Sequence, residues 1–358
     1  MKKKLLALAV GAIIAAPVSA LANAELYGRL NLSIDHFDGK EAGVPAGIGY
    51  DEQSGTYQLN SNKSFFGVRG GAELAAGLRG FYQLEFGVFL DESIQGADIF
   101  YTRNSFLGIE SGFGSVQAGR FDTPLRAMGA GVDQFRDIRY ADFANIVAGE
   151  WRADNIIQYT TPRIADMLTI AVATVAPENQ TDVTGSGVEN NKLFDTLSVS
   201  AMFDMGDFYA GVAYDKNNYG VLDENGLYLS DAYADSGVGI STLDLGGVND
   251  IYRIVAGVNL DALQIGVLLQ QAEDANDSDN KNRSYLLSAG FDLTDMVKLK
   301  AQYGETDFRN TDIKARQATI GADYMLGQQT KTFIYTTRQE VDGDRHFAVV
   351  GIGAEHRF

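Results

Sequence analysis

The chain has 358 residues, of which 29 are basic and 47 acidic, and it carries a formal charge of −18 with no cysteine. This acidity argues against nucleic acid as a partner, because phosphates attract basic surfaces, and the missing cysteines exclude disulfides. With 40 glycines and 5 prolines, the composition fits a soluble multidomain β protein as well as a membrane protein, so only the pattern along the chain separates the two.

Residues 1–24 are predicted to be a secretory signal peptide. Three lysines at positions 2–4 precede the apolar stretch 5–16, and the small-residue exit 22–24 follows. The apolar stretch is too short to cross a bilayer as a helix, which takes about 20 apolar residues. We therefore expect cleavage after Ala24 and export beyond the inner membrane.

Alternation with a period of two begins directly after the predicted cleavage site. One parity is apolar and comprises Leu26, Leu30, Leu32 and Ile34, whereas the other comprises Tyr27, Arg29, Asn31, Ser33 and Asp35. The segments 297–303 and 317–324 repeat this pattern. A period of two is typical of a strand with one apolar face and one wet face.

About sixteen such strands, an even number, are predicted along the mature chain. They begin near residues 25, 63, 77, 103, 114, 154, 168, 195, 207, 250, 262, 283, 296, 316, 329 and 345. Short connections such as 205–207 and 327–328 alternate with long polar ones such as 216–249, which is the layout of an outer-membrane barrel. Because unpaired sheet edges are not tolerated in hydrocarbon, the strand at 345–358 must pair with the strand at 25–37. The sequence therefore predicts an all-β fold, a sixteen-stranded antiparallel transmembrane β-barrel over residues 25–358.

Aromatic residues near strand ends are predicted to form interfacial girdles, with ordinary core packing as the alternative for each. They are Tyr101, Tyr159, Tyr214, Phe291, Tyr303 and Phe308.

Three motifs and the last residue together resemble the general Gram-negative porins. The motifs are Glu25–Arg29 (ELYGR), Ser64–Gly70 (SFFGVRG) and Thr102–Gly108 (TRNSFLG), and the last residue is Phe358. The resemblance covers essentially the whole chain. It implies a homotrimer in the outer membrane of a Gram-negative bacterium that passes small hydrophilic solutes and ions, and a third long loop, at about 123–149, folded into the lumen as a constriction.

In this family, acids on the constriction loop face basic residues on the barrel wall. Local alignment with the family assigns the wall positions to Arg29, Arg103 and Arg152, and the loop supplies Asp133 and Asp137. The alternatives are lumen or rim arginines with no filtering role and solvated loop acids. The chain departs from the enterobacterial members in two respects, because Phe65 stands where they carry arginine and the loop lacks their Pro-Glu-Phe signature.

The resemblance also makes Phe358 the signal that the barrel-assembly machinery recognises. Small residues of outward parity, Gly28, Ala348 and Ala354, would permit flat contact between subunits. Outer-membrane lipid and lipopolysaccharide are the expected surroundings, the latter meeting the acidic stretch 273–279 through divalent cations. That stretch also suggests calcium binding, but it lacks the glycine and distal glutamate of an EF-hand loop, so we expect a solvated loop and no metal site.

No motif for catalysis or for binding a cofactor is present, and the three histidines, His36, His346 and His356, lie outside any nucleophile arrangement. We therefore expect no enzyme and no cofactor. A general diffusion channel is the favoured function, with a substrate-specific channel that has a dedicated ligand site, or an outer-membrane enzyme or adhesin, as alternatives. The net charge suggests cation preference, but the constriction and not the total charge would set ion selectivity.

Overall fold

A computed structural model of the chain describes residues 24–39, 55–91, 100–176, 192–218, 249–275, 277–309, 313–342 and 345–358. The strand segments in these ranges are β1 (Glu25–Gly39), β2 (Thr56–Ser61), β3 (Phe65–Ala75), β4 (Leu78–Val88), β5 (Phe100–Thr102), β6 (Ser105–Ser111), β7 (Gly114–Asp122), β8 (Arg152–Thr160), β9 (Leu168–Val175), β10 (Leu197–Asp204), β11 (Phe208–Asn218), β12 (Asn249–Leu260), β13 (Leu263–Asp274), β14 (Lys281–Thr294), β15 (Val297–Phe308), β16 (Ile313–Met325), β17 (Thr330–Val341) and β18 (Arg345–Arg357). A short helix, α2 (Pro124–Gly129), and a 3-10 turn, η2 (Phe143–Asn145), lie between β7 and β8. The predicted signal peptide, apart from Ala24, lies outside the described residues.

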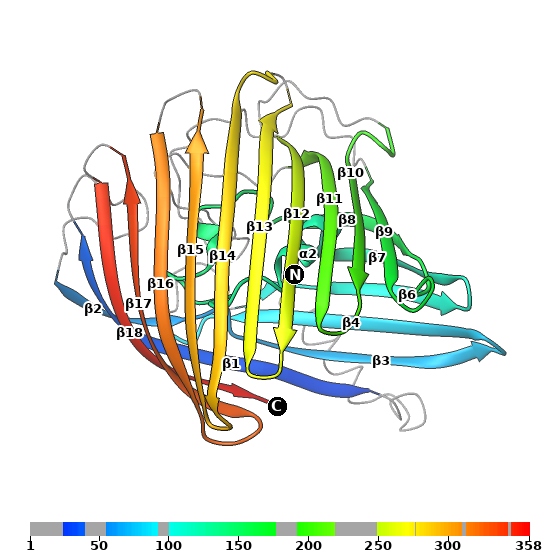
Figure 1. Cartoon of the computed structure of the whole chain (residues 1–358). Helices are drawn as coiled ribbons and strands as arrows, with labels where there is room; N and C mark the ends of the chain where they lie inside the picture. The colour runs from blue at the N-terminus through cyan, green and yellow to red at the C-terminus, as the bar shows by residue number, and fades with distance from the viewer. Residues whose placement is uncertain are drawn as a thin grey trace, which may run out of the picture.

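The eighteen described segments make sixteen transmembrane strands, because two of these strands are interrupted. Both β2 and β3 pair with β1, and both β5 and β6 pair with β4. Antiparallel pairing of β1 with β18, from Arg29 opposite Arg357 to Gly39 opposite Phe347, closes the sheet. The predicted sixteen-stranded barrel and the pairing of its two ends are therefore confirmed (Figure 1).

Alternation along the strands corresponds to the two faces of the wall. On β13, Ile265, Val267 and Leu269 are exposed on the outer face, where hydrocarbon replaces water, whereas Leu268 is fully buried on the inner face. An apolar residue is found on the inner face here because Leu268 belongs to one buried cluster with Val132 and Ile146. The segment between β7 and β8 therefore covers this part of the inner wall.

The girdle prediction holds for some aromatic residues and is wrong for two. Tyr159, Phe291 and Tyr303 are exposed on the outer face. In contrast, Tyr101 and Phe308 are buried on the inner face. Phe308 belongs to the apolar cluster under the inward loop, which explains why an aromatic side chain at a strand end is found in a core.

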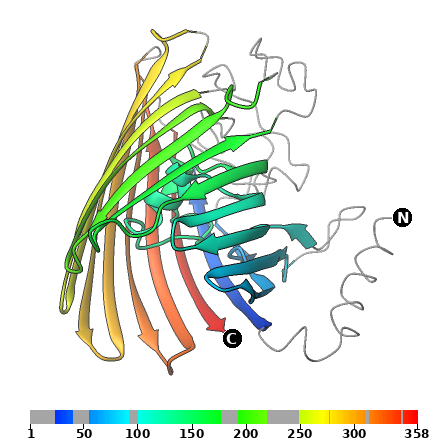
Figure 2. The ribbon, with the colours of Figure 1, turned by 90° about the vertical axis from the view of Figure 1, so that its right-hand side faces the viewer.

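The wall of the barrel is uneven in height (Figure 2). Segments β6 to β10 are 7 to 9 residues long, whereas β12 to β18 are 12 to 14 residues long. Within the described part of the chain, no helix is long and apolar enough to cross a membrane.

Candidate pore constriction

The segment 123–149 lies inside the barrel (Figure 2). Inward-facing amide side chains from separate parts of the wall hold it in place. Buried backbone groups need such partners, since an unpaired N–H or C=O is costly. The contacts are Arg139 N to Asn62 Oδ1 (3.0 Å), Gln134 N to Gln302 Oε1 (3.0 Å) and Gln317 Nε2 to Ala141 O (2.9 Å). These contacts hold the segment 123–149 against the inner face of the wall, and its role as a constriction stays a prediction.

Arg253 of β12 clamps the two ends of this loop together. Its guanidinium donates to the carbonyl oxygens of Leu125 (3.1 Å) and Ala148 (2.8 Å). It also donates to Glu150 Oε1 (2.7 Å) and to Gln270 Oε1 (2.7 Å). The Arg253 side chain is fully buried, so one residue satisfies backbone carbonyls at both the entry and the exit of the loop.

A cavity of about 800 Å³ lies between the loop and the wall. Its lining places four of the five predicted constriction residues around one space, namely Arg29, Arg103, Asp133 and Asp137. The fifth, Arg152, is not part of this lining. Its side chain is only 2% exposed and its Nε contacts Asp122 Oδ1 at 2.9 Å.

Arg29 of the wall and Asp137 of the segment 123–149 form a direct ion pair. Arg29 Nη2 lies 2.8 Å from Asp137 Oδ2, and Lys63 Nζ lies 3.7 Å from the other carboxylate oxygen. Although burial opposes ionisation, these cations hold the pKa of Asp137 well below its usual range. The carboxylate of Asp137 is therefore stabilised in its charged form within the cavity lining.

Phe65 occupies the gap between the two wall arginines. Its ring lies 5.3 Å from the guanidinium carbon of Arg29 and 4.9 Å from that of Arg103. Arg103 also pairs with Glu85 at 2.7 Å. A cation above an aromatic face is attracted by the ring quadrupole. Phe65, which stands where the enterobacterial members carry arginine, therefore separates and orients the guanidinium groups of Arg29 and Arg103.

Asp133 turns its carboxylate toward the backbone of the loop. One oxygen accepts from Phe135 N (2.8 Å) and the other from Phe143 N (3.3 Å). Burial and the neighbouring Asp142 carboxylate raise the pKa of Asp133 well above its usual range. Asp133 thus serves the fold of the loop, and a change to asparagine should alter ion selectivity less there than at Asp137.

Sequence reasoning missed six cations that line the same cavity, Arg69, Arg136, Lys298, Lys300, Lys331 and Arg357. Arg136, at the surface of the loop, keeps 42% of its side chain exposed. On the opposite wall, Lys300 and Lys331 flank Asp323 at 2.8 and 2.9 Å, and Lys298 donates to Gln264 Oε1. Alternation along the strand already indicated that Lys298 and Lys300 face the lumen. It did not indicate that they lie near the loop, because they are far from it in the sequence.

The charge of the cavity differs from that of the chain. Among the described residues, its lining holds eight cations, Arg29, Arg69, Arg103, Arg136, Lys298, Lys300, Lys331 and Arg357. It holds seven acids, Glu25, Glu85, Asp122, Asp133, Asp137, Asp323 and Glu355. The formal lining charge is therefore +1, against −18 for the whole chain.

Phe358 closes the barrel at its seam. Its N–H donates to Gly28 O (3.1 Å), and its carbonyl accepts from Gly28 N (2.9 Å). A Cβ on residue 28 would lie 2.5 Å from the Phe358 ring, so the ring needs glycine beneath it. Gly28 is therefore covered by the chain's own terminus, and the expectation that it offers a small subunit contact is corrected.

Comparison with known proteins finds a family model and relatives that match most of the chain. A family model described as Gram-negative porin matches residues 7–344. The chain is 25% identical to the major outer membrane protein P.IB of Neisseria gonorrhoeae, over 93% of this chain and 92% of the relative. It is 26% identical to the outer membrane porin protein 32 of Delftia acidovorans, over 93% and 88%.

Solved porin structures share the fold at lower identity. The anion-selective porin from Comamonas acidovorans superposes with a TM-score of 0.69 at 20% identity, covering 94% of this chain and 99% of that one. Salmonella typhi OmpF gives 0.66 at 14% identity, covering 94% and 98%. Together with the closed barrel, these matches identify a multi-pass outer-membrane protein of a Gram-negative bacterium, and the chain belongs to the Gram-negative porin family.

Proposed function

We propose that the chain forms a water-filled channel through which small hydrophilic solutes and ions diffuse passively. The observation that carries this proposal is the cavity beside the inward loop, which lies within a closed barrel and is lined by charges of both signs. A lumen of this kind needs no catalytic centre, because its width and its fixed charges decide what passes. The family consists of channels rather than enzymes.

We further infer that the channel prefers anions weakly, although the chain is acidic. An ion at the waist is within a Debye length, about 8 Å at physiological salt, of the lining charges, whereas distant loop charges are screened. The lining is formally +1. The formal charge of the cavity lining is therefore opposite in sign to the net charge of the chain.

Planar-bilayer recording tests both statements. We expect an ohmic conductance that rises with salt without saturation, and a small reversal potential of the sign for anion preference in a potassium chloride gradient. A silent protein would refute the channel. A clearly cation-selective reversal potential would refute the assignment of selectivity to the described lining.

One observation favours the second candidate, a channel with a dedicated ligand site. Lys298, Lys300 and Lys331 lie around the carboxylate of Asp323, and Asp292 is opposite Lys298. Three ammonium groups beside two carboxylates suit an oxyanion. Conductance that saturates with a multivalent anion, but not with chloride, would support this function over general diffusion.

A homotrimer is also proposed. A solved structure of Vibrio cholerae OmpT, which shares the fold at 16% identity and a TM-score of 0.62, is described as a trimer form. In this chain Ala354 is exposed on the outer face of β18 and leaves room for close contact. Light scattering in mild detergent should give the mass of three protomers, and a mass of one protomer would contradict the proposal.

A further inference from the structure

A break in the second transmembrane strand lies against the inward loop. Strand β2 ends at Ser61 and β3 begins at Phe65, and the three residues between them, Asn62, Lys63 and Ser64, are buried. Lys63 has a φ of 49°, in the left-handed region, which a residue other than glycine adopts at a cost. Such a conformation persists only where the surrounding contacts fix it.

Side chains join the break to β1 on one side and to the loop on the other. Asn62 Nδ2 donates to Asn31 Oδ1 (3.1 Å), and Asn62 Oδ1 accepts from Arg139 N (3.0 Å). Arg29 donates from Nη2 to the carbonyl oxygen of Lys63 at 3.0 Å. The backbone of Lys63 is therefore fixed between the wall and the loop.

The ammonium group of Lys63 contacts Asp142 of the loop. Lys63 Nζ lies 2.9 Å from Asp142 Oδ2 and 3.7 Å from Asp137 Oδ1. Asp142 Oδ2 also accepts from Asp137 N at 2.9 Å, and Asp137 has a φ of 69°. One carboxylate oxygen thus joins a wall cation to the backbone of the residue whose own carboxylate contacts Arg29.

Lys63 and Asp142 lie behind the cavity rather than in its lining. Arg29 and Asp137 belong to the lining, whereas the side chains of Lys63 and Asp142 are only 8% and 6% exposed. The buried pair can therefore act on a solute only through its field and through the residues in front of it.

Asp142 owes its charged form to this one cation. Although burial opposes ionisation, the Lys63 ammonium holds the pKa of Asp142 below its ordinary value. Four further charged groups lie within electrostatic range of the pair, namely the carboxylates of Asp133, Asp137 and Glu150 and the guanidinium of Arg126. Because three of the four are acids, loss of the ammonium would leave Asp142 mainly among like charges.

We propose that Lys63 is a positioning residue for ion preference, which neutralises Asp142 behind the cavity and holds the Asp137 carboxylate against Arg29. The inference rests on the proposed channel function. An Asp142 carboxylate without its cation would cancel the formal +1 charge of the lining. Anion preference therefore depends on a lysine that no permeating ion touches.

The test replaces Lys63 by methionine, which keeps the length of the side chain and adds no branch at Cβ. Reversal potentials in a potassium chloride gradient are recorded at pH 8 and pH 5, and each variant is compared with the unchanged protein at the same pH. At pH 8 we expect the ratio of chloride to potassium permeability to fall on the order of threefold. Without Lys63 the pKa of Asp142 rises, so Asp142 takes up a proton as the pH falls, and the difference should shrink at pH 5.

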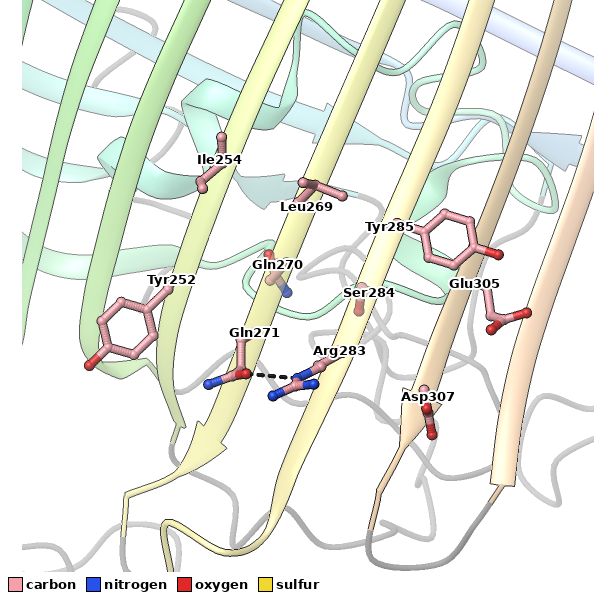
Figure 3. Close-up of a pocket in the computed structure, with 10 residues that line it drawn as sticks. All are labelled: Tyr252, Ile254, Leu269, Gln270, Gln271, Arg283, Ser284, Tyr285, Glu305 and Asp307. Carbon is pink, nitrogen blue, oxygen red and sulfur yellow. Dashed lines mark hydrogen bonds between the residues drawn. The ribbon is translucent and has the colours of Figure 1, made fainter.

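Three variants separate neutralisation of Asp142 from a general effect on packing. Lys63→Met combined with Asp142→Asn removes both charges and should restore the ratio at both pH values, and Lys63→Arg should keep it. The matched control is Lys314→Met, which removes a lysine that pairs with Glu305 at 3.2 Å. Glu305 lies on the outer wall beside Tyr285 (Figure 3), so this control should leave the ratio unchanged.

Two results would overturn the inference. One is a ratio in Lys63→Met that equals that of the unchanged protein at both pH values, and the other is a lowered ratio that Asp142→Asn does not restore. If Lys63→Met does not fold, Asp142→Asn alone provides the comparison, because the ammonium left behind should raise the ratio, and an unchanged ratio would refute the role of the pair. A silent unchanged protein would instead overturn the proposed channel itself, and with it this inference.

Discussion

Replacing Arg253 by methionine should release the constriction loop. The change removes four hydrogen bonds from the guanidinium, two of them to backbone carbonyls at the two ends of the loop. It also removes the 2.7 Å ion pair of the buried Glu150, whose other carboxylate oxygen lies 3.8 Å from Arg126 Nε. Breaking one side of a buried ion pair costs about 3–5 kcal/mol.

We take the lower end of that range, about 3 kcal/mol, because Arg126 Nε still lies 3.8 Å from Glu150 Oε2. Such a loss raises the ratio of channels with a displaced loop to channels with a packed loop by roughly 100-fold. Single-channel recordings of Arg253→Met should therefore show frequent brief substates that are absent from the unchanged protein, while the barrel itself still folds.

The sign of the pH dependence follows from Glu150. Burial raises the pKa of Glu150 above its ordinary value, and the Arg253 cation opposes that rise. Without the cation the pKa rises further, so the packed loop takes up a proton more readily than the displaced loop. Packing in the variant is then restored as the pH falls through the raised pKa and is lost as the pH rises.

Substates should accordingly be more frequent at pH 8 than at pH 5 in Arg253→Met. The matched control is the double variant with Glu150→Gln, which removes the titrating group and should show substates that do not depend on pH. Recordings of Arg253→Met that match those of the unchanged protein at both pH values would refute the role of this clamp.

Three further predictions follow from the waist and the seam. Arg103→Ala should raise conductance and shift the reversal potential toward cation preference, whereas Asp137→Asn should shift it toward anion preference. Arg152→Ala should cause a smaller shift toward cation preference than Arg103→Ala, because Arg152 lies outside the cavity lining. Identical reversal potentials in all three variants would show that these residues do not line the waist. Phe65→Arg should add a cation between two others, lowering conductance and increasing anion preference, and a shift toward cations in salt-gradient recordings would contradict this geometry. Deleting Phe358 should impair insertion and leave the conductance of inserted channels unchanged, which quantitative blotting of outer membranes tests; normal levels would show that the terminal ring has no assembly role.

Alternation of apolar and polar residues was enough to predict the barrel, because each strand has one face toward lipid and the other toward water. The same reasoning fails where the inner face is dry. Leu268 and Ile251 face inward but are apolar, since the loop packs over them, and no local pattern shows which strands a loop will cover.

The constriction was predicted in part for a similar reason. Arg29 and Asp137, both named from the family resemblance, form an ion pair, but the carboxylate of Asp133 accepts hydrogen bonds from two backbone N–H groups of the loop. Lys300 contributes to the same cavity from β15. Which acid faces solvent and which distant strand faces the loop depend on the path of the loop, and the sequence does not reveal that path.

The uneven wall of the barrel has a consequence for the surrounding bilayer. Strand β9 has 8 residues and β14 has 14, which at roughly 3.4 Å per residue and a tilt near 40° gives heights of about 21 Å and 36 Å. The apolar band of such barrels is about 25 Å tall. Lipid against β9 would have to thin by a few ångströms, whereas lipid against β14 would not, and this hydrophobic mismatch costs a fraction of a kcal/mol per ångström. The described wall would therefore require a thinner bilayer beside β9 than beside β14.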